Sequence, residues 1–164
     1  MTLAKMKRYV KAITAYEQAL RLDPHNANIY SGKGNALAKL ALHEEALKAY
    51  EQALRLNPDN TFAHYNRGIM LAKLQQYRKA LAAYNQALRL DPNYADIYYR
   101  KGNVLVMLMR NKEALVAYDR ARTLYPNNYI IKIIRLKLMR AIARALAAIQ
   151  DRLDKKTQEK MGVR

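Results

Sequence analysis

Residues 27–60 read ANIYSGKGNALAKLALHEEALKAYEQALRLNPDN, and similar segments follow at 61–94 and 95–128. The four prolines of the chain lie at a constant interval of 34 residues, at Pro24, Pro58, Pro92 and Pro126. Columns of small and aromatic residues keep the same interval, at Gly34, Gly68 and Gly102, at Ala46, Ala80 and Ala114, and at Tyr50, Tyr84 and Tyr118. One period shared by several residue types indicates a repeat array in which each unit packs on its neighbours.

The residue types within one unit also follow a set order. An aromatic residue comes first, small residues follow, a second aromatic lies in the second half, and a proline closes the unit. Between Ala27 and Asn60 these residues are Tyr30, Gly34, Ala46, Tyr50, Ala53 and Pro58. This order resembles the tetratricopeptide repeat family over about residues 1–128. The resemblance implies an all-α fold, a right-handed superhelix of helix hairpins, and a non-enzymatic binding scaffold.

The repeat boundaries predict one domain, 1–154, followed by a flexible basic tail, 155–164. The domain would comprise a partial repeat at 1–26, full repeats at 27–60, 61–94 and 95–128, and a C-terminal capping helix at 129–154. First helices are expected near 27–40, 61–74 and 95–108, and second helices near 43–56, 77–90 and 111–124. The family usually has glycine in the turn inside each hairpin, but these turns contain none.

The chain begins inside a repeat. Residues 3–6 are in register with the ends of the first helices, so we expect a stub there and a second helix at about 9–22. The missing half-unit has two interpretations. The chain is a truncated fragment, or it presents a face that is open to a second copy.

The segment after Tyr129 departs from the repeat. No proline, glycine or asparagine interrupts residues 129–153, so we expect one helix of about 25 residues, roughly 38 Å long. One side of this helix is apolar and holds Ile131, Leu138, Ile142, Leu146, Ile149 and Leu153. Three roles are open for it: it caps the last repeat, it mediates homo-oligomerisation, or its basic amphipathic surface lies on an anionic membrane.

The chain is strongly basic. It carries 30 Lys and Arg against 13 Asp and Glu, which gives a formal net charge of +17. Such a field favours acidic partners, and we expect an acidic protein or peptide. Nucleic acid and anionic membrane are weaker alternatives. The tyrosines are explained mainly by the repeat columns, and no RNA-binding motif is present.

The sequence offers no constellation for catalysis. It has no cysteine, which excludes thiol chemistry and zinc–thiolate sites. His25, His43 and His64 occupy turn or packing positions, and no HExxH motif, phosphate loop or dinucleotide fingerprint occurs. We therefore predict no enzyme activity, no metal site and no cofactor. The N-terminus lacks the apolar core of a signal peptide and no long apolar run occurs, so we expect a cytoplasmic protein.

The resemblance places the concave side of the superhelix on the first helices. Transferred column by column, it selects a peptide-binding groove formed by Asn35, Lys39, Tyr65, Asn66, Lys73, Tyr99, Arg100 and Asn103. Lysine and arginine would meet carboxylates, asparagine would pair with an extended backbone, and tyrosine would supply apolar area.

One subclass of the family grips a C-terminal carboxylate with two lysines, two asparagines and an arginine. Asn35, Asn66 and Arg100 match three of these positions. Ser31 and Asp96 stand where the two lysines belong, and Asp96 would repel a carboxylate. We therefore expect an acidic segment to bind in the groove without this clamp.

Overall fold

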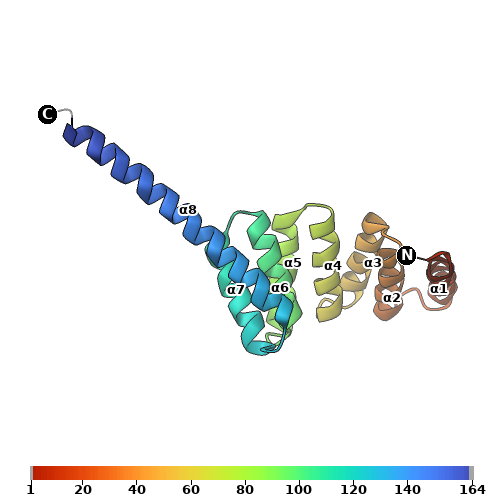
Figure 1. The fold of residues 1–164 in the computed structure, drawn as a ribbon. Coiled ribbons are helices and arrows are strands. Elements are labelled where there is room, and N and C mark those ends of the chain that lie inside the picture. The colour runs from red at the N-terminus through yellow and green to blue at the C-terminus, as the bar shows by residue number, and fades with distance from the viewer. Residues whose placement is uncertain (1, 163–164) are drawn as a thin grey trace.

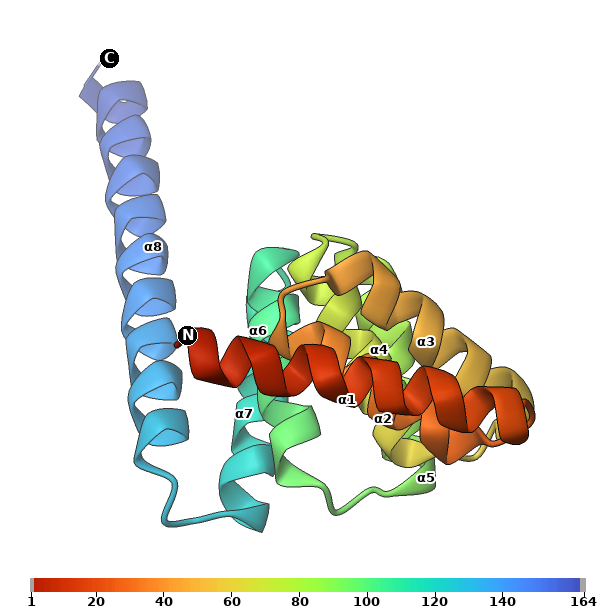
Figure 2. The same ribbon diagram turned by 90° about the vertical axis from the view of Figure 1, so that its right-hand side faces the viewer.

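The computed structural model describes residues 2–162, which form eight helices and no strand (Figure 1). Their bounds are α1 Leu3–Leu22, α2 Ala27–Lys39, α3 His43–Leu56, α4 Thr61–Lys73, α5 Tyr77–Leu90, α6 Ala95–Met107, α7 Asn111–Leu124 and α8 Tyr129–Gly162. Helices α2 to α7 form three hairpins that stack along the chain, with α1 and α8 at the two ends (Figures 1 and 2). This architecture confirms the predicted all-α solenoid, and helices α2 to α7 end within one residue of the expected positions.

Each hairpin closes on a glycine of its first helix and a tyrosine of its second. A Cβ atom added at Gly68 would lie 2.5 Å from Cε1 of Tyr84, closer than van der Waals contact allows. The same contact recurs as Gly34 with Tyr50 and as Gly102 with Tyr118. These tyrosines and the alanine columns beside them are buried and form the core. The 34-residue columns therefore mark the places where helices touch.

The turn inside each hairpin is closed by a non-glycine residue in the left-handed backbone region. These residues are Ala41 (φ 61°), Gln75 (φ 58°) and Met109 (φ 59°). In the first turn the N–H of Ala41 donates to the carbonyl of Ala38, and the N–H of Leu42 to that of Leu37, both at 3.1 Å. This is the Schellman arrangement, which usually employs glycine. The side chains present at these turns therefore impose backbone strain.

The connections between repeats use short polar side chains. The Oδ1 atom of Asp91 accepts the N–H of Asn93 at 3.0 Å just after α5 ends. The Oδ1 atom of Asn60 accepts the N–H of Ala63 at 2.9 Å and caps the start of α4. Since proline disfavours helix in the residue before it, each second helix stops there and the next helix starts a few residues later.

The N-terminal helix differs from the prediction. Because α1 is continuous from Leu3 to Leu22, the expectation of a separate stub is wrong. Lys7 occupies the position of the left-handed Ala41 but stays helical within α1. None of the α1 side chains is buried. This end of the stack is therefore open.

The C-terminal helix is longer than predicted and continues to Gly162. Residues 155–162, expected as a flexible tail, belong to α8, while 163–164 lie outside the described residues. The apolar stripe ends at Leu153, but the helix continues because no glycine or proline follows until Gly162 and Lys155 pairs with Asp151 at 2.9 Å. Only the first half packs on the repeats: Ile131 is buried beside Tyr118, whereas every side chain from Ala143 to Glu159 is exposed.

Ion pairs join the second helix of one repeat to the first helix of the next. They link Glu17 to Lys33 at 2.8 Å, Glu51 to Arg67 at 3.9 Å, and Asp119 to Arg135 at 2.5 Å. At the junction between α5 and α6 the same columns hold Asn85 and Lys101, which cannot form an ion pair. Burial lowers the pKa of Lys101 below its usual value. This junction therefore has a partly buried cation without the carboxylate found at the other three.

Candidate peptide-binding groove

A cavity of about 250 Å³ lies between α4 and α6, the first helices of the second and third full repeats. Its wall contains three of the eight predicted groove residues, Lys73 from α4 and Arg100 and Asn103 from α6. The remaining wall residues are Ile69, Ala72, Tyr77, Tyr84, Val104 and Met107. Residues spaced three and four apart share one side of a helix, which explains why Arg100 and Asn103 face the same cavity. The site thus combines two cations with an apolar surface.

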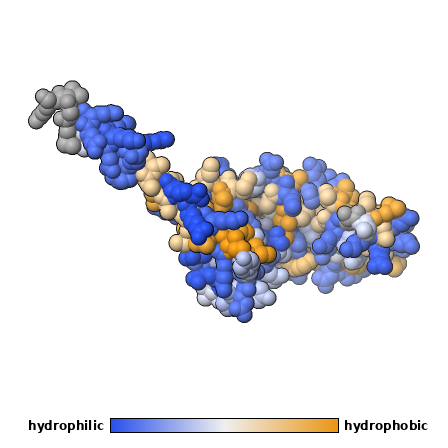
Figure 3. All heavy atoms as spheres, in the orientation of Figure 1, coloured by the Kyte–Doolittle hydropathy of each residue, from blue (hydrophilic) through white to orange (hydrophobic). Residues whose placement is uncertain are grey.

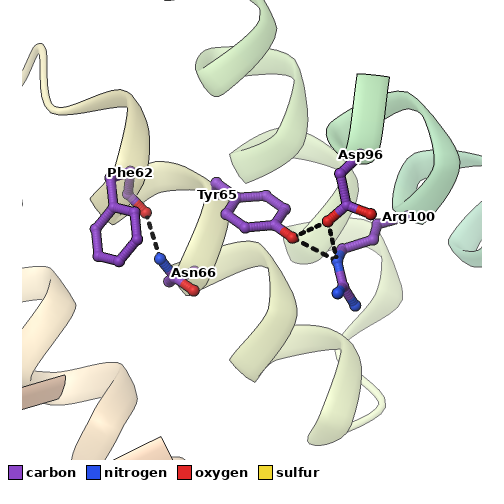
Figure 4. A network of polar contacts seen from close by, with 5 residues as sticks. All are labelled: Phe62, Tyr65, Asn66, Asp96 and Arg100. Atoms are coloured by element: carbon purple, nitrogen blue, oxygen red, sulfur yellow. Dashed lines mark hydrogen bonds and ion pairs between the residues drawn. The ribbon is translucent and has the colours of Figure 1, made fainter. Parts of the chain in front are cut away.

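Arg100 is held in place by two neighbours (Figure 4). Its Nε–H lies 2.6 Å from the hydroxyl of Tyr65 and 2.9 Å from Oδ2 of Asp96. The hydroxyl of Tyr65 also donates to Asp96, and the Arg100 guanidinium carbon lies 5.6 Å from the centre of the Tyr65 ring. These contacts fix the orientation of Arg100 by its inner nitrogen alone.

The outer part of the Arg100 guanidinium is not used by the network. Figure 4 shows its terminal nitrogens pointing away from Asp96, and they donate no hydrogen bond within residues 2–162. Burial works against the charge of Arg100, but Tyr65 and Asp96 stabilise it and hold its pKa above the usual value. Arg100 therefore presents a fixed positive charge with free donors, the geometry that binds a carboxylate through two hydrogen bonds.

Tyr84 differs from its counterparts in the other hairpins. The hydroxyls of Tyr50 and Tyr118 donate to the side chains of Asn35 at 3.1 Å and Asn103 at 2.7 Å. In the middle hairpin Ile69 replaces this asparagine, so the Tyr84 hydroxyl has no such partner in the described chain. Burial raises the pKa of Tyr84, which keeps its hydroxyl protonated. A free donor therefore lies at the cavity wall.

The other predicted groove residues make internal contacts or lie outside this cavity. Tyr65 and Asn66 are each only 8% exposed, and Nδ2 of Asn66 donates to the carbonyl of Phe62 at 2.9 Å. Tyr99 is half-buried, with its ring 6.2 Å from that of Tyr118. Lys39 is exposed one repeat earlier. A peptide-binding role for these residues and for Asn35 stays a prediction.

Sequence reasoning missed the contribution of the second helices. Tyr77 and Tyr84 of α5 reach the cavity, although the resemblance assigns the surface to first helices. A signal was present in the asparagine column, where Ile69 interrupts Asn35 and Asn103 and leaves one tyrosine hydroxyl unpaired. The replacement of asparagine by Ile69 in this column therefore points to the repeat in which the tyrosine hydroxyl lacks an internal partner.

Within the described part of the chain, no group of three or more His, Asp or Glu side chains is arranged to hold a metal ion. Of the eight helices, none is both long enough and apolar enough to cross a membrane.

The sequence matches three family models. A family model described as TPR repeat matches residues 2–40 and 70–108. Two models described as tetratricopeptide repeat match residues 27–60 and 49–82. Together these matches run from residue 2 to residue 108 without a gap. No curated protein gives a significant match.

Solved structures share the fold. The Arabidopsis OM64 TPR domain is 27% identical with a TM-score of 0.68, covering 70% of this chain and 95% of that one. The first TPR of Spaghetti (RPAP3) bound to the HSP90 peptide SRMEEVD is 28% identical with a TM-score of 0.70, covering 74% and 96%. The structure of MamA is 23% identical with a TM-score of 0.73, covering 94% and 98%, and supports the fold alone. The chain belongs to the tetratricopeptide repeat family, and it is a protein-interaction scaffold and not an enzyme.

Proposed function

We propose that the first-helix surface of this scaffold binds an extended acidic segment of a partner protein. The observation that supports this proposal is the cavity between α4 and α6, where Lys73, Arg100 and the Tyr84 hydroxyl surround apolar side chains. Arginine suits a carboxylate because its planar fork donates two parallel hydrogen bonds. A net charge of +17 would speed the approach of such a partner.

The same surroundings suggest what the segment looks like. The carboxylate of an aspartate or glutamate side chain would meet Arg100 and Lys73. A neighbouring apolar side chain would contact Ile69, Val104 and Met107, which line the same cavity. The peptide backbone would pair with asparagine amides such as that of Asn103. Lys39 would extend the row of positive charge by one repeat.

We expect acidic side chains, not a free C-terminus, to be the recognised group. Ser31 and Asp96 occupy positions where the carboxylate-gripping subclass has lysine. Asp96 already pairs with Arg100 at 2.9 Å, so it cannot supply the second cation with which that subclass holds a terminal carboxylate. Action in the cytoplasm, inferred from the sequence alone, is also part of the proposal.

A titration with labelled peptides at physiological salt tests the site. The peptide SRMEEVD, bound by the related RPAP3 domain, is a suitable probe. Lys73→Glu should weaken its binding about tenfold or more, since hydrogen bonds to charged groups contribute about 1.5–3 kcal/mol. Lys48→Glu changes the net charge equally but lies at a separate cavity between α1, α2 and α3, so it is the matched control. Adding Lys39→Glu to Lys73→Glu should weaken binding further.

Two modified peptides identify the recognised group. We expect an amidated SRMEEVD to bind like the free acid, and SRMQQVD to bind more weakly. Unchanged affinity in Lys73→Glu would reject the site. An equal loss in Lys48→Glu would assign binding to net charge instead. A loss caused by amidation alone would show that the chain reads a C-terminus.

A further inference from the structure

A second cavity lies on another side of α6. It measures about 320 Å³ and is formed by α6 and α7, with Lys101, Leu105 and Val116 among the residues of its wall. At 3.6 residues per turn, Leu105 lies on nearly the opposite side of α6 from Asn103 and Met107, which line the cavity between α4 and α6. The two cavities are therefore separate surfaces of the molecule.

The N-terminal repeats contain a cavity that is built from the same columns of residues. It measures about 350 Å³ and lies between α1, α2 and α3, with Lys33 in the column of Lys101. Glu17 of the preceding helix also belongs to its wall, and the Glu17 carboxylate lies 2.8 Å from Nζ of Lys33. At the C-terminal cavity the residue in the Glu17 column is Asn85, which cannot form an ion pair. The N-terminal cavity therefore shows which group fits the position left open in the C-terminal one, namely a carboxylate.

Lys101 has no partner for its charge. It is half-buried, and its ammonium group forms no ion pair within residues 2–162. Burial lowers the pKa of Lys101, while Glu113 raises it and Arg110 lowers it further. Glu113 lies at the cavity wall, but both of its carboxylate oxygens accept hydrogen bonds from Arg110 at 2.7 Å. A carboxylate that pairs directly with Lys101 and favours its charged form would therefore have to come from another molecule.

The rest of the wall indicates what accompanies that carboxylate. Val116 is 71% exposed and takes the place that Lys48 has in the N-terminal cavity. Arg120 takes the place of Gln52 and adds a second cation. Two cations beside exposed apolar surface suit an acidic side chain that is followed by an apolar one. A nucleic-acid backbone would leave Val116 uncovered.

The chain itself leaves this cavity open. Helix α8 packs on α7 and then projects from the stack (Figures 1 and 2), and none of its residues lines the cavity. On the face drawn in Figure 3, apolar and hydrophilic residues are interspersed over the repeats, whereas the distal end of α8 is hydrophilic. Mixed charged and apolar surface of the kind found at this cavity is therefore a property of the repeats.

We propose that this cavity, here called the lateral site and comprising Lys101, Leu105, Val116 and Arg120, binds a second acidic segment of a partner protein. A side-chain carboxylate of the segment pairs with Lys101 as Glu17 pairs with Lys33, and a neighbouring apolar side chain covers Val116. Because the lateral site and the cavity between α4 and α6 are separate, the scaffold can hold two acidic segments at once. The lateral site does not depend on the function proposed above.

Methyl-detected NMR titrations of the full chain at physiological salt test the lateral site. The probe is the tetrapeptide EVEV, acetylated and amidated, and QVQV is its uncharged counterpart. We expect EVEV to shift the methyl signals of Val116 and Leu105. Lys101→Gln should weaken this binding about tenfold, because it removes a hydrogen bond between charged groups. Lys48→Gln removes the same charge at the wall of the N-terminal cavity and is the matched control, which should bind like the parent.

Asn85→Glu tests the site without removing the cation. Its carboxylate should pair with Lys101 from within the chain, as Glu17 does with Lys33. We therefore expect Asn85→Glu to weaken the response of Val116 to EVEV as Lys101→Gln does, and Asn85→Gln to leave it unchanged. An equal loss in Asn85→Glu and Asn85→Gln would show that charge is not the cause and would overturn the proposal.

The methyl signals of Ile69 and Met107 report the cavity between α4 and α6 in the same titration, so the two sites can fail separately. Shifts at Ile69 and Met107 with none at Val116 would overturn the lateral site and leave the function proposed above intact. An equal response to QVQV, full binding by Lys101→Gln, or an equal loss in Lys48→Gln would also overturn it. A response of Val116 to single-stranded RNA and not to EVEV would assign the cavity to nucleic acid instead.

Discussion

Individual glycines set how closely the helices of each hairpin approach. Gly68 faces the ring of Tyr84, which is buried in the core and has nowhere to move. Gly32 faces the ring of Tyr16 in a similar way, with 2.7 Å from a built Cβ to Cζ. Tyr16, however, lies on α1 at the open end of the stack and is only half-buried. The same residue type thus has different constraints at two positions.

Gly68→Ala should therefore destabilise the fold by about 1–3 kcal/mol, the usual cost of overpacking a core. Gly32→Ala is the matched control, because Tyr16 is free to shift. Alanine also favours helix over glycine by about 0.5–1 kcal/mol, so this change should be neutral or stabilising. Urea unfolding of both variants measures the difference. Equal stability of the two variants would contradict the packing argument.

At the left-handed residues of the hairpin turns, we expect replacement by glycine to stabilise the protein. Gln75 has φ 58° and an exposed side chain, and a side chain in this region costs about 1–2 kcal/mol. Gln75→Gly should remove this strain and, after the flexibility of glycine is subtracted, stabilise the protein by about 0.5–1 kcal/mol. Ala82→Gly, at an exposed position inside α5, should do the reverse. Thermal unfolding that ranked these variants the other way would show that the turn is not strained.

At the scale of helices, the junction between α5 and α6 is the one without an ion pair among the four described. Asn85→Glu would place a carboxylate near Lys101, as Glu51 lies near Arg67. We expect a gain of about 0.5 kcal/mol, because partly exposed ion pairs contribute about 0.2–1 kcal/mol. Asn85→Gln is the uncharged control. The gain should shrink in about 1 M salt, and a gain that is insensitive to salt would exclude the ion pair as its cause.

The helices that the sequence predicted well are those with a neighbour on each side. For α2 to α7 the spacing of Gly, Ala and Tyr reports contacts with flanking helices, so the 34-residue period located them within a residue. Within residues 2–162, α1 packs on α2 and α8 packs on α7, so each has a neighbour on one side only. The turn expected near Lys7 did not form, and α8 continued past the end of its apolar stripe at Leu153. Periodicity predicts packed helices and has no information about the ends of unpacked ones.

The cavity between α4 and α6 contains part of the predicted groove. Lys73, Arg100 and Asn103 line it together, because helical spacing fixes the direction of a side chain. The residue columns did not predict that Tyr65 would turn its hydroxyl to Asp96 and Arg100, since this contact joins side chains of two different repeats. Partner choice between side chains depends on their shape and reach, which a column of residue types does not record.

The molecule as a whole depends on buried tyrosines repeated along its length. Tyr50, Tyr84 and Tyr118 are at most 1% exposed. Burial raises the pKa of all three, to about 12 for Tyr118, above the ordinary value of 10.0. In the unfolded chain these hydroxyls ionise first, so the unfolded state holds fewer protons above pH 10. The stability that these tyrosines contribute to the folded state is therefore fully present below about pH 10. It is lost as the pH rises towards their pKa values in the folded state.

We predict that the free energy of unfolding falls steeply between about pH 10 and pH 12, by up to about 1.4 kcal/mol per pH unit for each buried tyrosine. Tyr84→Phe should make this decline shallower, because one ionising group is removed. Tyr129→Phe changes a side chain that is 72% exposed and should leave the slope unchanged. Urea titrations at several alkaline pH values give the slopes. Identical slopes for Tyr84→Phe and the parent would refute the assignment.

The charged columns at the junctions make whole units interchangeable. Glu51 and Asn85 occupy the same position in successive repeats, as do Arg67 and Lys101. If residues 61–94 were deleted, α3 would precede α6, and Glu51 would lie beside Lys101 as it now lies beside Arg67. In the shortened array every junction between repeats would have an ion pair, whereas the junction between α5 and α6 now has none. Loss of a repeat therefore need not leave a charged residue at a junction without a partner. The number of repeats can change while the contacts between repeats are kept.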